Sequence, residues 1–494
     1  MKRIIASLLV CVLCIGLAAV ATVADFEETQ SRVHQHLEAA EKAPCTHGDT
    51  QLCTHLPLLE INTGGQTIPG NPVRNEDHET VGYTTAENGE PRITVSLEIT
   101  DHNDTNNHPD DTPTVSSSAL FNIRGRSSRS FDKKNYRVTL VNEDGTNNNQ
   151  SVMGMDAHHE WVLHGPFLDK TLIRNYMWYN IAGEMMEYAP NVRFCEVIID
   201  GEYQGLYLMV ESIDKGYDGS RLSMEVKKKG STFSGYVLRI NDLHFFEDAT
   251  SVIYDYGNYA YVSRVPVEVV YPGTVNQTEE TRRAIELEFS AFEKALYSFD
   301  YDSKDYGYTQ WIDTASFVDY YVLNEFTCNL DAGRLSTYVY KDVSGQYKIC
   351  VWDFNNACDN YIESRVNLHD FDIHNRLLYH MLCRDEAFTE AIITRYKELR
   401  QSYLSEEYLM NYIDQTIAFL GPAIQRNFDK WGYSFQPEYT YLIGEDRDLH
   451  SYEEAVSQLK NFLIQRGNWM DRNIDAIREF SAESAVKKHN EHAD

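Results

Sequence analysis

The dominant hydrophobic period of this 494-residue chain changes a little beyond the middle, with one helix expected in the first part and one hairpin in the second. Up to about residue 245, apolar and polar residues alternate, as in PRITVSLEIT at 91–100, and a period of two is typical of half-buried strands. From about residue 278 the apolar residues recur at helical spacing. This order predicts an α+β protein with a β-rich first part and a helical second part.

Residues typical of turns and helix caps indicate where individual strands and helices begin and end. Asp200-Gly201 is a strong hairpin signal, and residues 168–190 predict a helix that is capped near Asp169 or Thr171 and ends at Pro190. The other strands are expected within 56–63, 91–100, 117–125, 135–145, 161–165, 192–211 and 235–242, with a hairpin at 336–354, and the other helices within 278–298, 311–326, 376–404, 407–431 and 452–480.

No Pro- or Ser-rich linker and no internal repeat divides the chain, although its length alone would allow about three domains. We therefore predict one catalytic unit over 53–482, with a β-rich lobe at about 53–245, a helical lobe at about 278–482 and a cleft between them. Polar segments flank this unit at 25–52 and 483–494.

The amino terminus has the pattern of a secretory signal. Lys2 and Arg3 precede an apolar run over 4–20, and small residues lead to expected cleavage after Ala21 or Ala24. Residues 1–24 thus predict a secreted or cell-surface protein, without a further membrane span. Seven cysteines remain after cleavage, and Cys45 with Cys53 could close a small loop before the main unit.

The overall charge excludes one class of partner by default. Lys and Arg number 44 against 75 Asp and Glu, which leaves a formal charge of −31. A phosphate backbone is bound by clustered Lys and Arg, so nucleic acid is not an expected partner. The acidic field favours basic partners instead.

Two aspartates flank the hairpin at 336–354. Asp331 follows a predicted helix, and Asp353 follows the second hairpin strand, 353 − 331 = 22 residues later. Phosphoryl transfer needs one carboxylate to orient the attacking hydroxyl and another to hold Mg²⁺ against the phosphates. The spacing fits that chemistry, and it fits equally a turn cap and a strand end.

A basic segment between two predicted strands is a candidate for binding an anion. It contains Arg124, Gly125 and Arg126, and continues through Ser127 to Lys134 and Arg137. Turn amides with neighbouring Lys and Arg side chains can neutralise phosphate oxygens. A solvated basic hairpin is the alternative, since neither GxxxxGK[ST] nor GxGxxG occurs here.

Six motifs together resemble the spore-coat protein H (CotH) kinase family, in the family's order, from roughly Leu56 to Phe480. The resemblance implies a divergent, bilobal protein-kinase-like fold that uses ATP with Mg²⁺ or Mn²⁺ to phosphorylate secreted or spore-coat proteins. The motifs are RGRSSRSFDKKNYRV, WVLHGPFLDKTLIRN, DGEYQGLYLMVESI, NLDAGRLSTYVYKD, QYKICVWDF and FLIQRGNWMDRNID.

The resemblance also implies site residues. Asp331 matches the catalytic-loop aspartate and Asp353 the metal-binding aspartate, whereas Arg174 and Asn175, in the helix motif, are interpreted as structural. The remaining positions concern ATP: Tyr347 would stack on the adenine, the backbone of Glu211 would meet the adenine edge, and Lys134, Arg124 and Arg126 would face the phosphates.

Two positions depart from the family pattern. Asn355 follows WDF where many members have Asp, and Ser336 stands where a kinase-type loop has a metal-binding Asn. The main hypothesis is an exported protein kinase acting on a basic, Ser-rich protein. A catalytically degenerate surface or coat binding protein and a carbohydrate-active or accessory protein remain alternatives.

Overall fold

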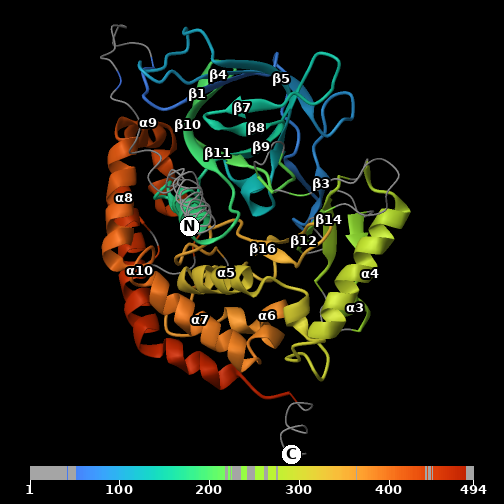
Figure 1. Ribbon diagram of the computed structural model, residues 1–494. Coiled ribbons are helices and arrows are strands. Elements are labelled where there is room, and N and C mark those ends of the chain that lie inside the picture. Colours follow the sequence, from blue (N-terminus) through green and yellow to red (C-terminus); the bar gives the residue numbers. More distant parts are fainter. Residues whose placement is uncertain are drawn as a thin grey trace, which may run out of the picture.

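The computed structural model places a β-rich part above a helical part (Figure 1). The predicted signal segment 1–24 and Cys45 lie outside the described residues, as does the tail from 485 onward. The structure describes residues 42, 52–216, 221–222, 224, 235–241, 251–260, 265–273, 276–362, 364–439, 442, 447 and 449–484.

Seven strands close into a barrel, in the order β1-β10-β11-β9-β6-β5-β4. Along β4 every second residue from Ile93 to Ile99 is buried and those between are exposed, so the predicted alternation fills the barrel with one face of each strand. The barrel strands are β1 (Leu58–Asn62), β4 (Ile93–Thr100), β5 (Val115–Arg124), β6 (Asn135–Val141), β9 (Glu160–His164), β10 (Val192–Ile199) and β11 (Glu202–Glu211).

The hairpin predicted at Asp200-Gly201 is confirmed. These two residues join β10 to β11 and have φ of 49° and 79°. Positive φ at both central positions is what a two-residue hairpin turn of this kind requires. Two short ribbons complete this part, β2 (Pro72–Arg74) with β3 (Thr80–Tyr83) and β7 (Gln150–Val152) with β8 (Met155–His158).

A second sheet lies between the barrel and the helices, with strand order β13-β14-β12-β15-β16. The predicted hairpin at 336–354 is confirmed as its last two strands. The strand expected at 235–242 pairs with this hairpin and not with the barrel, as the register Leu238 to Val339 shows. The strands are β12 (Tyr236–Ile240), β13 (Val252–Ile253), β14 (Val267–Tyr271), β15 (Thr337–Lys341) and β16 (Lys348–Cys350).

The predicted helices are present, but two of them are split. Asp385 caps a new helix within 376–404 by accepting a hydrogen bond from the Ala387 amide, 3.0 Å away. Gly421, with φ of 45°, and Pro422 divide the segment 407–431. The helices are α2 (Arg174–Met185), α3 (Tyr256–Tyr259), α4 (Glu279–Leu296), α5 (Thr314–Phe326), α6 (Leu377–Leu382), α7 (Glu386–Leu399), α8 (Glu406–Leu420), α9 (Pro422–Trp431) and α10 (Tyr452–Asn473).

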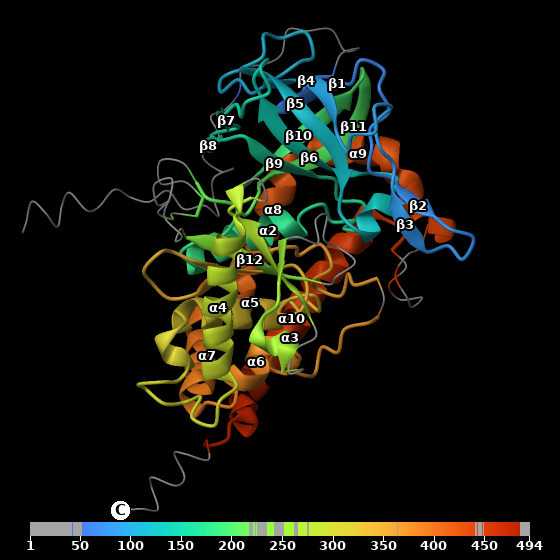
Figure 2. The same cartoon turned by 90° about the vertical axis from the view of Figure 1, so that its right-hand side faces the viewer.

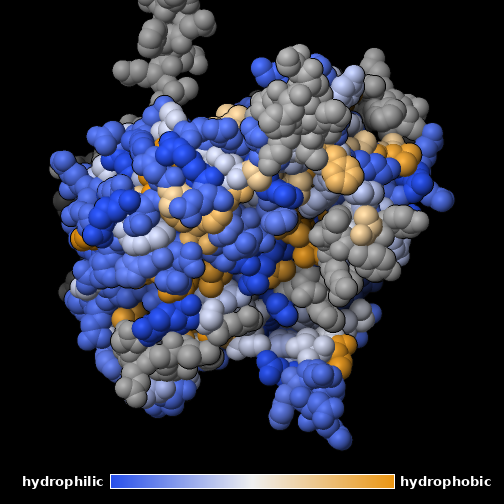
Figure 3. All heavy atoms as spheres, turned by 90° about the horizontal axis from the view of Figure 1, so that it is seen from below, coloured by the Kyte–Doolittle hydropathy of each residue, from blue (hydrophilic) through white to orange (hydrophobic). Residues whose placement is uncertain are grey.

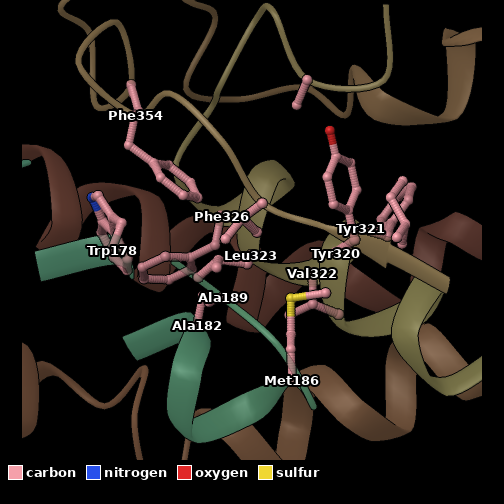
Figure 4. Close-up of a cluster of buried hydrophobic side chains, with 14 of the residues drawn as sticks. Trp178, Ala182, Met186, Ala189, Tyr320, Tyr321, Val322, Leu323, Phe326 and Phe354 are labelled. Carbon is pink, nitrogen blue, oxygen red and sulfur yellow. The ribbon is translucent and has the colours of Figure 1, made fainter. Parts of the chain in front are cut away.

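One hydrophobic core joins α2, α5 and the segment after β16 (Figure 4). The ring of Phe354 is fully buried and lies 6.2 Å from the ring of Trp178, which itself contacts Phe326 edge-on. Burying a phenylalanine of this size stabilises the fold by about 1.5–3 kcal/mol. The core therefore fixes the position of Asp353, the residue before Phe354.

The face of the molecule that is seen from below in Figure 3 is mainly hydrophilic and has small, separate apolar patches. Among the described residues, no helix is both long enough and apolar enough to cross a membrane.

Candidate active site

The loop that carries Asp331 begins where α5 ends. The Asn329 amide donates to the carbonyl of Asn324, 3.0 Å away, and the Leu335 amide donates to the carbonyl of Asp331, 2.8 Å away. Gly333 donates to the hydroxyl of Tyr320 at 3.1 Å. The loop is thus held by its own backbone and by α5, which leaves the Asp331 side chain 16% exposed.

The loop that carries Asp353 follows β16. Asp353 has φ of 63°, a left-handed conformation that Asp and Asn adopt more readily than other side chains. Its amide donates to the hydroxyl of Tyr179 at 3.0 Å, and the next amide, of Phe354, donates to Asn175 Oδ1 at 2.7 Å. Both acceptors belong to α2, so this helix sets the direction in which the Asp353 carboxylate points.

Asn329 ties the two loops together. Its side-chain amide donates to Asn324 Oδ1 at 3.0 Å and to the backbone carbonyl of Asp353 at 3.2 Å. The carboxylates of Asp331 and Asp353 are close enough to interact. Burial, and next the charge of Asp331, raise the pKa of Asp353 to about 6, whereas Arg124 acts to lower it. The structure therefore brings together three of the seven predicted site residues.

A residue that the sequence did not single out completes this cluster. Asn356 donates from Nδ2 to Asp331 Oδ2 at 3.1 Å, and its Oδ1 accepts from Asn355 at 3.0 Å. Arg334 lies 3.6 Å from Asp331 Oδ1, too far for a hydrogen bond, and this buried oxygen has no hydrogen-bond partner among the described residues. The doubled Asn after WDF is the signal that could have identified Asn356.

A buried ion pair between Arg174 and Asp169 supports the loop that follows Asp353. Arg174 Nη1 lies 2.5 Å from Asp169 Oδ1, with both side chains at most 3% exposed. Arg174 also donates from Nε to the carbonyl of Ala357 at 3.1 Å. Asp169 in turn accepts from the Arg174 amide at 2.9 Å, and the interpretation of Arg174 as structural fits these contacts. The helix itself begins later than predicted, at Arg174, with Ile173 and not Asp169 or Thr171 at the N-cap position.

We expect Arg174→Met to destabilise the protein by about 3–5 kcal/mol, because it leaves the Asp169 carboxylate buried and unpaired. Urea denaturation measures the change. Lys397→Met is the matched control, since Lys397 pairs with Asp475 at 3.0 Å while both side chains are more than half exposed, and such pairs contribute little. Equal losses in the two variants would contradict the structural role of Arg174.

The basic segment forms the loop between β5 and β6. An added Cβ at Gly125, whose φ is 106°, would collide with Ser128 Oγ, so the tight turn requires glycine. Arg124, at the end of β5, faces the ring of Trp352 at 5.8 Å. Lys134 donates to the carbonyl of Arg129 at 2.7 Å, and Arg126 is exposed. Of the three predicted phosphate residues, Arg124 interacts with Asp353.

Tyr347 does not offer a surface for stacking, which corrects one prediction. It is fully buried, its hydroxyl lies 2.7 Å from that of Tyr236, and its ring packs against Phe289 and Phe292. The backbone of Tyr347 is also paired, because Ile312 forms an isolated β-bridge with it and the Asp313 amide donates to its carbonyl.

The backbone N–H of Glu211 is already paired within the protein. Its backbone N–H donates to the carbonyl of Asn191 at 3.0 Å, and its buried carboxylate accepts from the Asn191 amide at 2.9 Å. This N–H is therefore not available to the edge of an adenine. Trp352, next to Asp353, is a half-buried aromatic residue beside the site.

Two further titratable groups, His164 and Lys170, are buried in the segment before α2. His164 ends β9 and lies 3.1 Å from Asn175 Nδ2, and burial lowers its pKa to about 3, so it is neutral at physiological pH. The Lys170 ammonium is buried without a hydrogen-bond partner among the described residues, and burial lowers its pKa to about 7. Both lie in the motif WVLHGPFLDKTLIRN, which does not by itself show that they are buried.

The oxygen atoms of this cluster suit a hard divalent cation. No group of three or more His, Cys, Asp and Glu side chains gathers into a metal cage in the described part of the chain. Mg²⁺, however, is typically bound by one or two carboxylates together with substrate phosphates. The unbonded Asp331 Oδ1 and the mutually repelling carboxylates of Asp331 and Asp353 fit such a cation.

The fold and site define a mixed α+β protein whose β barrel and helices meet at a pair of loop-borne aspartates. The chain matches the family model described as CotH kinase protein over residues 121–470, most of its length, and it belongs to that family. The predicted family is thereby confirmed, and membership points to a kinase-like function. No curated protein matches the chain.

The raised pKa of Asp353 predicts a pH dependence. The folded protein holds this proton up to about pH 6, whereas the ordinary value is 3.8. Without divalent cations, ionised Asp353 therefore costs stability above pH 6, and the cost disappears as the pH falls towards 4. We expect Asp353→Asn to exceed the wild type in free energy of unfolding by more at pH 7.5 than at pH 5. An equal difference at both pH values would contradict the assignment.

Proposed function

We propose that this protein is an ATP-dependent protein kinase that transfers phosphate to Ser or Thr hydroxyls. The observation that carries the proposal is the aspartate pair, linked through Asn329 and opposed by Arg124. In phosphoryl transfer, catalysis is mostly positioning and charge stabilisation. Asp331 would orient the incoming hydroxyl, and Asp353 would hold the divalent cation.

We interpret the barrel and the helical part as the two lobes of a divergent protein-kinase-like fold. The β15–β16 hairpin separates the two carboxylates in sequence, and the end of β5 brings Arg124 close to Asp353 from the barrel. This order, catalytic aspartate, hairpin and metal-binding aspartate, supports the interpretation together with the family.

Within this proposal, different residues of the chain would contact the phosphates, the base and the cation of bound ATP. Arg124 would neutralise phosphate oxygens, since its positive charge already acts on the Asp353 carboxylate. The Trp352 indole would contact the base, in place of the buried Tyr347. Asp353 would supply carboxylate oxygens for Mg²⁺ or Mn²⁺, which would screen the phosphate charges.

The site of action and the substrate are part of the proposal. The charged, apolar and small-residue pattern of residues 1–24 supports export, and the family supports secreted or coat proteins as substrates. A net charge of −31 favours a basic, Ser-rich substrate and disfavours nucleic acid.

Nucleotide binding tests the proposal. We expect ATP with Mg²⁺ or Mn²⁺ to raise the melting temperature of the wild type, because a ligand that binds only the native state stabilises it. Arg124→Ala should weaken ATP binding by about 1–3 kcal/mol, the range for a charge-assisted contact, and adenosine binding much less. The control is Lys304→Ala, which removes an exposed cation from the loop after α4. If ATP and adenosine weaken alike, Arg124 does not contact phosphate.

One specific observation favours a second candidate, a binding protein that keeps the fold without activity. Ser336 and Asn355 replace side chains that would carry metal-ligating oxygens in an active kinase. That candidate predicts nucleotide-induced stabilisation without any phosphate transfer.

A further inference from the structure

The ribbon formed by β2 and β3 presents apolar side chains to solvent. Val73 is 43% exposed, Val81 64% and Tyr83 41%, and the ribbon projects from the side of the barrel (Figure 2). It is a sheet of only two strands, so each strand has an outer edge on which no further strand pairs among the described residues. Such edges accept an added strand from a partner.

The ribbon is fastened to the loop between β5 and β6. Arg129 in this loop donates to the carbonyl of Gly70 at 2.8 Å and faces the ring of Tyr83 at 4.0 Å. Arg74 of the ribbon donates to Ser130 Oγ at 3.0 Å. A segment bound on the ribbon would therefore lie next to the loop that begins at Arg124.

The tip of the ribbon carries negative charge in a defined conformation. Glu76, Asp77 and Glu79 are exposed, and Asn75 Oδ1 accepts from the amides of Asp77 and Glu79 at 3.1 and 2.8 Å. These carboxylates lie beyond the apolar residues of the same ribbon. A partner that covers both needs apolar and basic side chains in one extended segment.

We propose that the β2–β3 ribbon docks an extended, Lys- or Arg-rich segment of the protein substrate whose Ser or Thr is phosphorylated. The inference rests on the proposed function and adds where the substrate binds. Apolar side chains of the segment cover Val73 and Val81, and its basic side chains face the acidic tip. A second copy of this chain fits less well, because it carries a net charge of −31 itself.

Binding and transfer are measured separately on the full chain. The probe is a fluorescent synthetic peptide of Lys, Val and Ser residues, followed by anisotropy at low salt and without nucleotide. Val73→Ser with Val81→Ser, and separately Glu76→Lys with Asp77→Lys, should each weaken peptide binding by about tenfold, the effect of a few modest contacts. Raising the salt concentration should weaken peptide binding more in the wild type than in the charge-reversed variant.

Matched controls lie elsewhere on the surface. Leu287→Ser with Phe299→Ser removes apolar side chains that are 56% and 83% exposed, and Glu479→Lys with Glu483→Lys reverses exposed charges near the end of the described chain. These variants should bind the peptide like the wild type, and stabilisation by ATP should be unchanged in all of them.

The outcomes separate the two proposals. Ribbon variants that bind the peptide as tightly as the wild type, or a wild type that does not bind it, would overturn the docking proposal even if ATP binding and transfer are normal. A wild type that binds the peptide through the ribbon but is not stabilised by ATP would support docking and reject the kinase function. Where transfer occurs, the ribbon variants should raise KM for the peptide about tenfold and leave kcat within twofold.

Discussion

Asp353→Asn should abolish the stabilisation of the protein by ATP that depends on Mg²⁺ or Mn²⁺. At a nucleotide concentration 100 times Kd, the wild type should gain about 2.7 kcal/mol from the ligand, and the variant should gain almost none, since an amide is a much weaker cation ligand than a carboxylate. Asparagine keeps the left-handed backbone that Asp353 adopts at φ of 63°. Thermal unfolding with and without nucleotide and cation measures the difference.

The design separates ligand loss from misfolding. Without cations, the variant should melt within a few degrees of the wild type or above it, because the substitution removes a carboxylate whose charge burial and Asp331 disfavour. Equal nucleotide shifts in wild type and variant would exclude Asp353 as a metal ligand.

Asp331→Ala should keep ATP and cation binding but lose phosphate transfer to protein. The Asp331 carboxylate carries a buried oxygen without a hydrogen-bond partner among the described residues, as expected for a group that meets an incoming hydroxyl. Positioned acid and base groups typically contribute about 10²–10⁴-fold to a rate. Radiolabel transfer from ATP and nucleotide affinity, measured in parallel, should separate this variant from Asp353→Asn, which loses both.

Asn356→Ala adds a control for the geometry around Asp331. It removes the contact to Asp331 Oδ2 but retains both carboxylates, so transfer should fall by less than in Asp331→Ala. An Asp331→Ala variant that transfers phosphate at the wild-type rate would refute the catalytic role of this residue.

Local patterns predicted much of the fold. The alternation at 91–100 became β4, and Asp200-Gly201 became a hairpin turn, because each depends on neighbours in sequence. The helix breaks at Asp385 and Gly421 were missed, since the apolar spacing continues across both. Their cap and turn signals were outweighed by the longer periodic pattern.

Contacts between distant segments could not be predicted in the same way. The strand at 236–240 pairs with β15, about 100 residues later, and is not a strand of the barrel. Tyr347 is part of the core because its ring packs against Phe289 and Phe292. Asp331 and Asp353 were identified because they flank one hairpin. Asn356 and Trp352 were not, since their roles follow from loops that only the folded chain brings together.

The most direct test of the account is phosphate transfer by the wild-type protein itself. Purified full-length chain is incubated with ATP, Mg²⁺ or Mn²⁺ and a Lys- and Ser-rich protein, and phosphorylated residues are mapped by mass spectrometry, with Asp331→Ala in parallel. The account predicts phosphate on Ser or Thr of the substrate or of the chain, and its loss in the variant. Wild-type protein that is stabilised by ATP but never transfers phosphate under either cation would contradict the account.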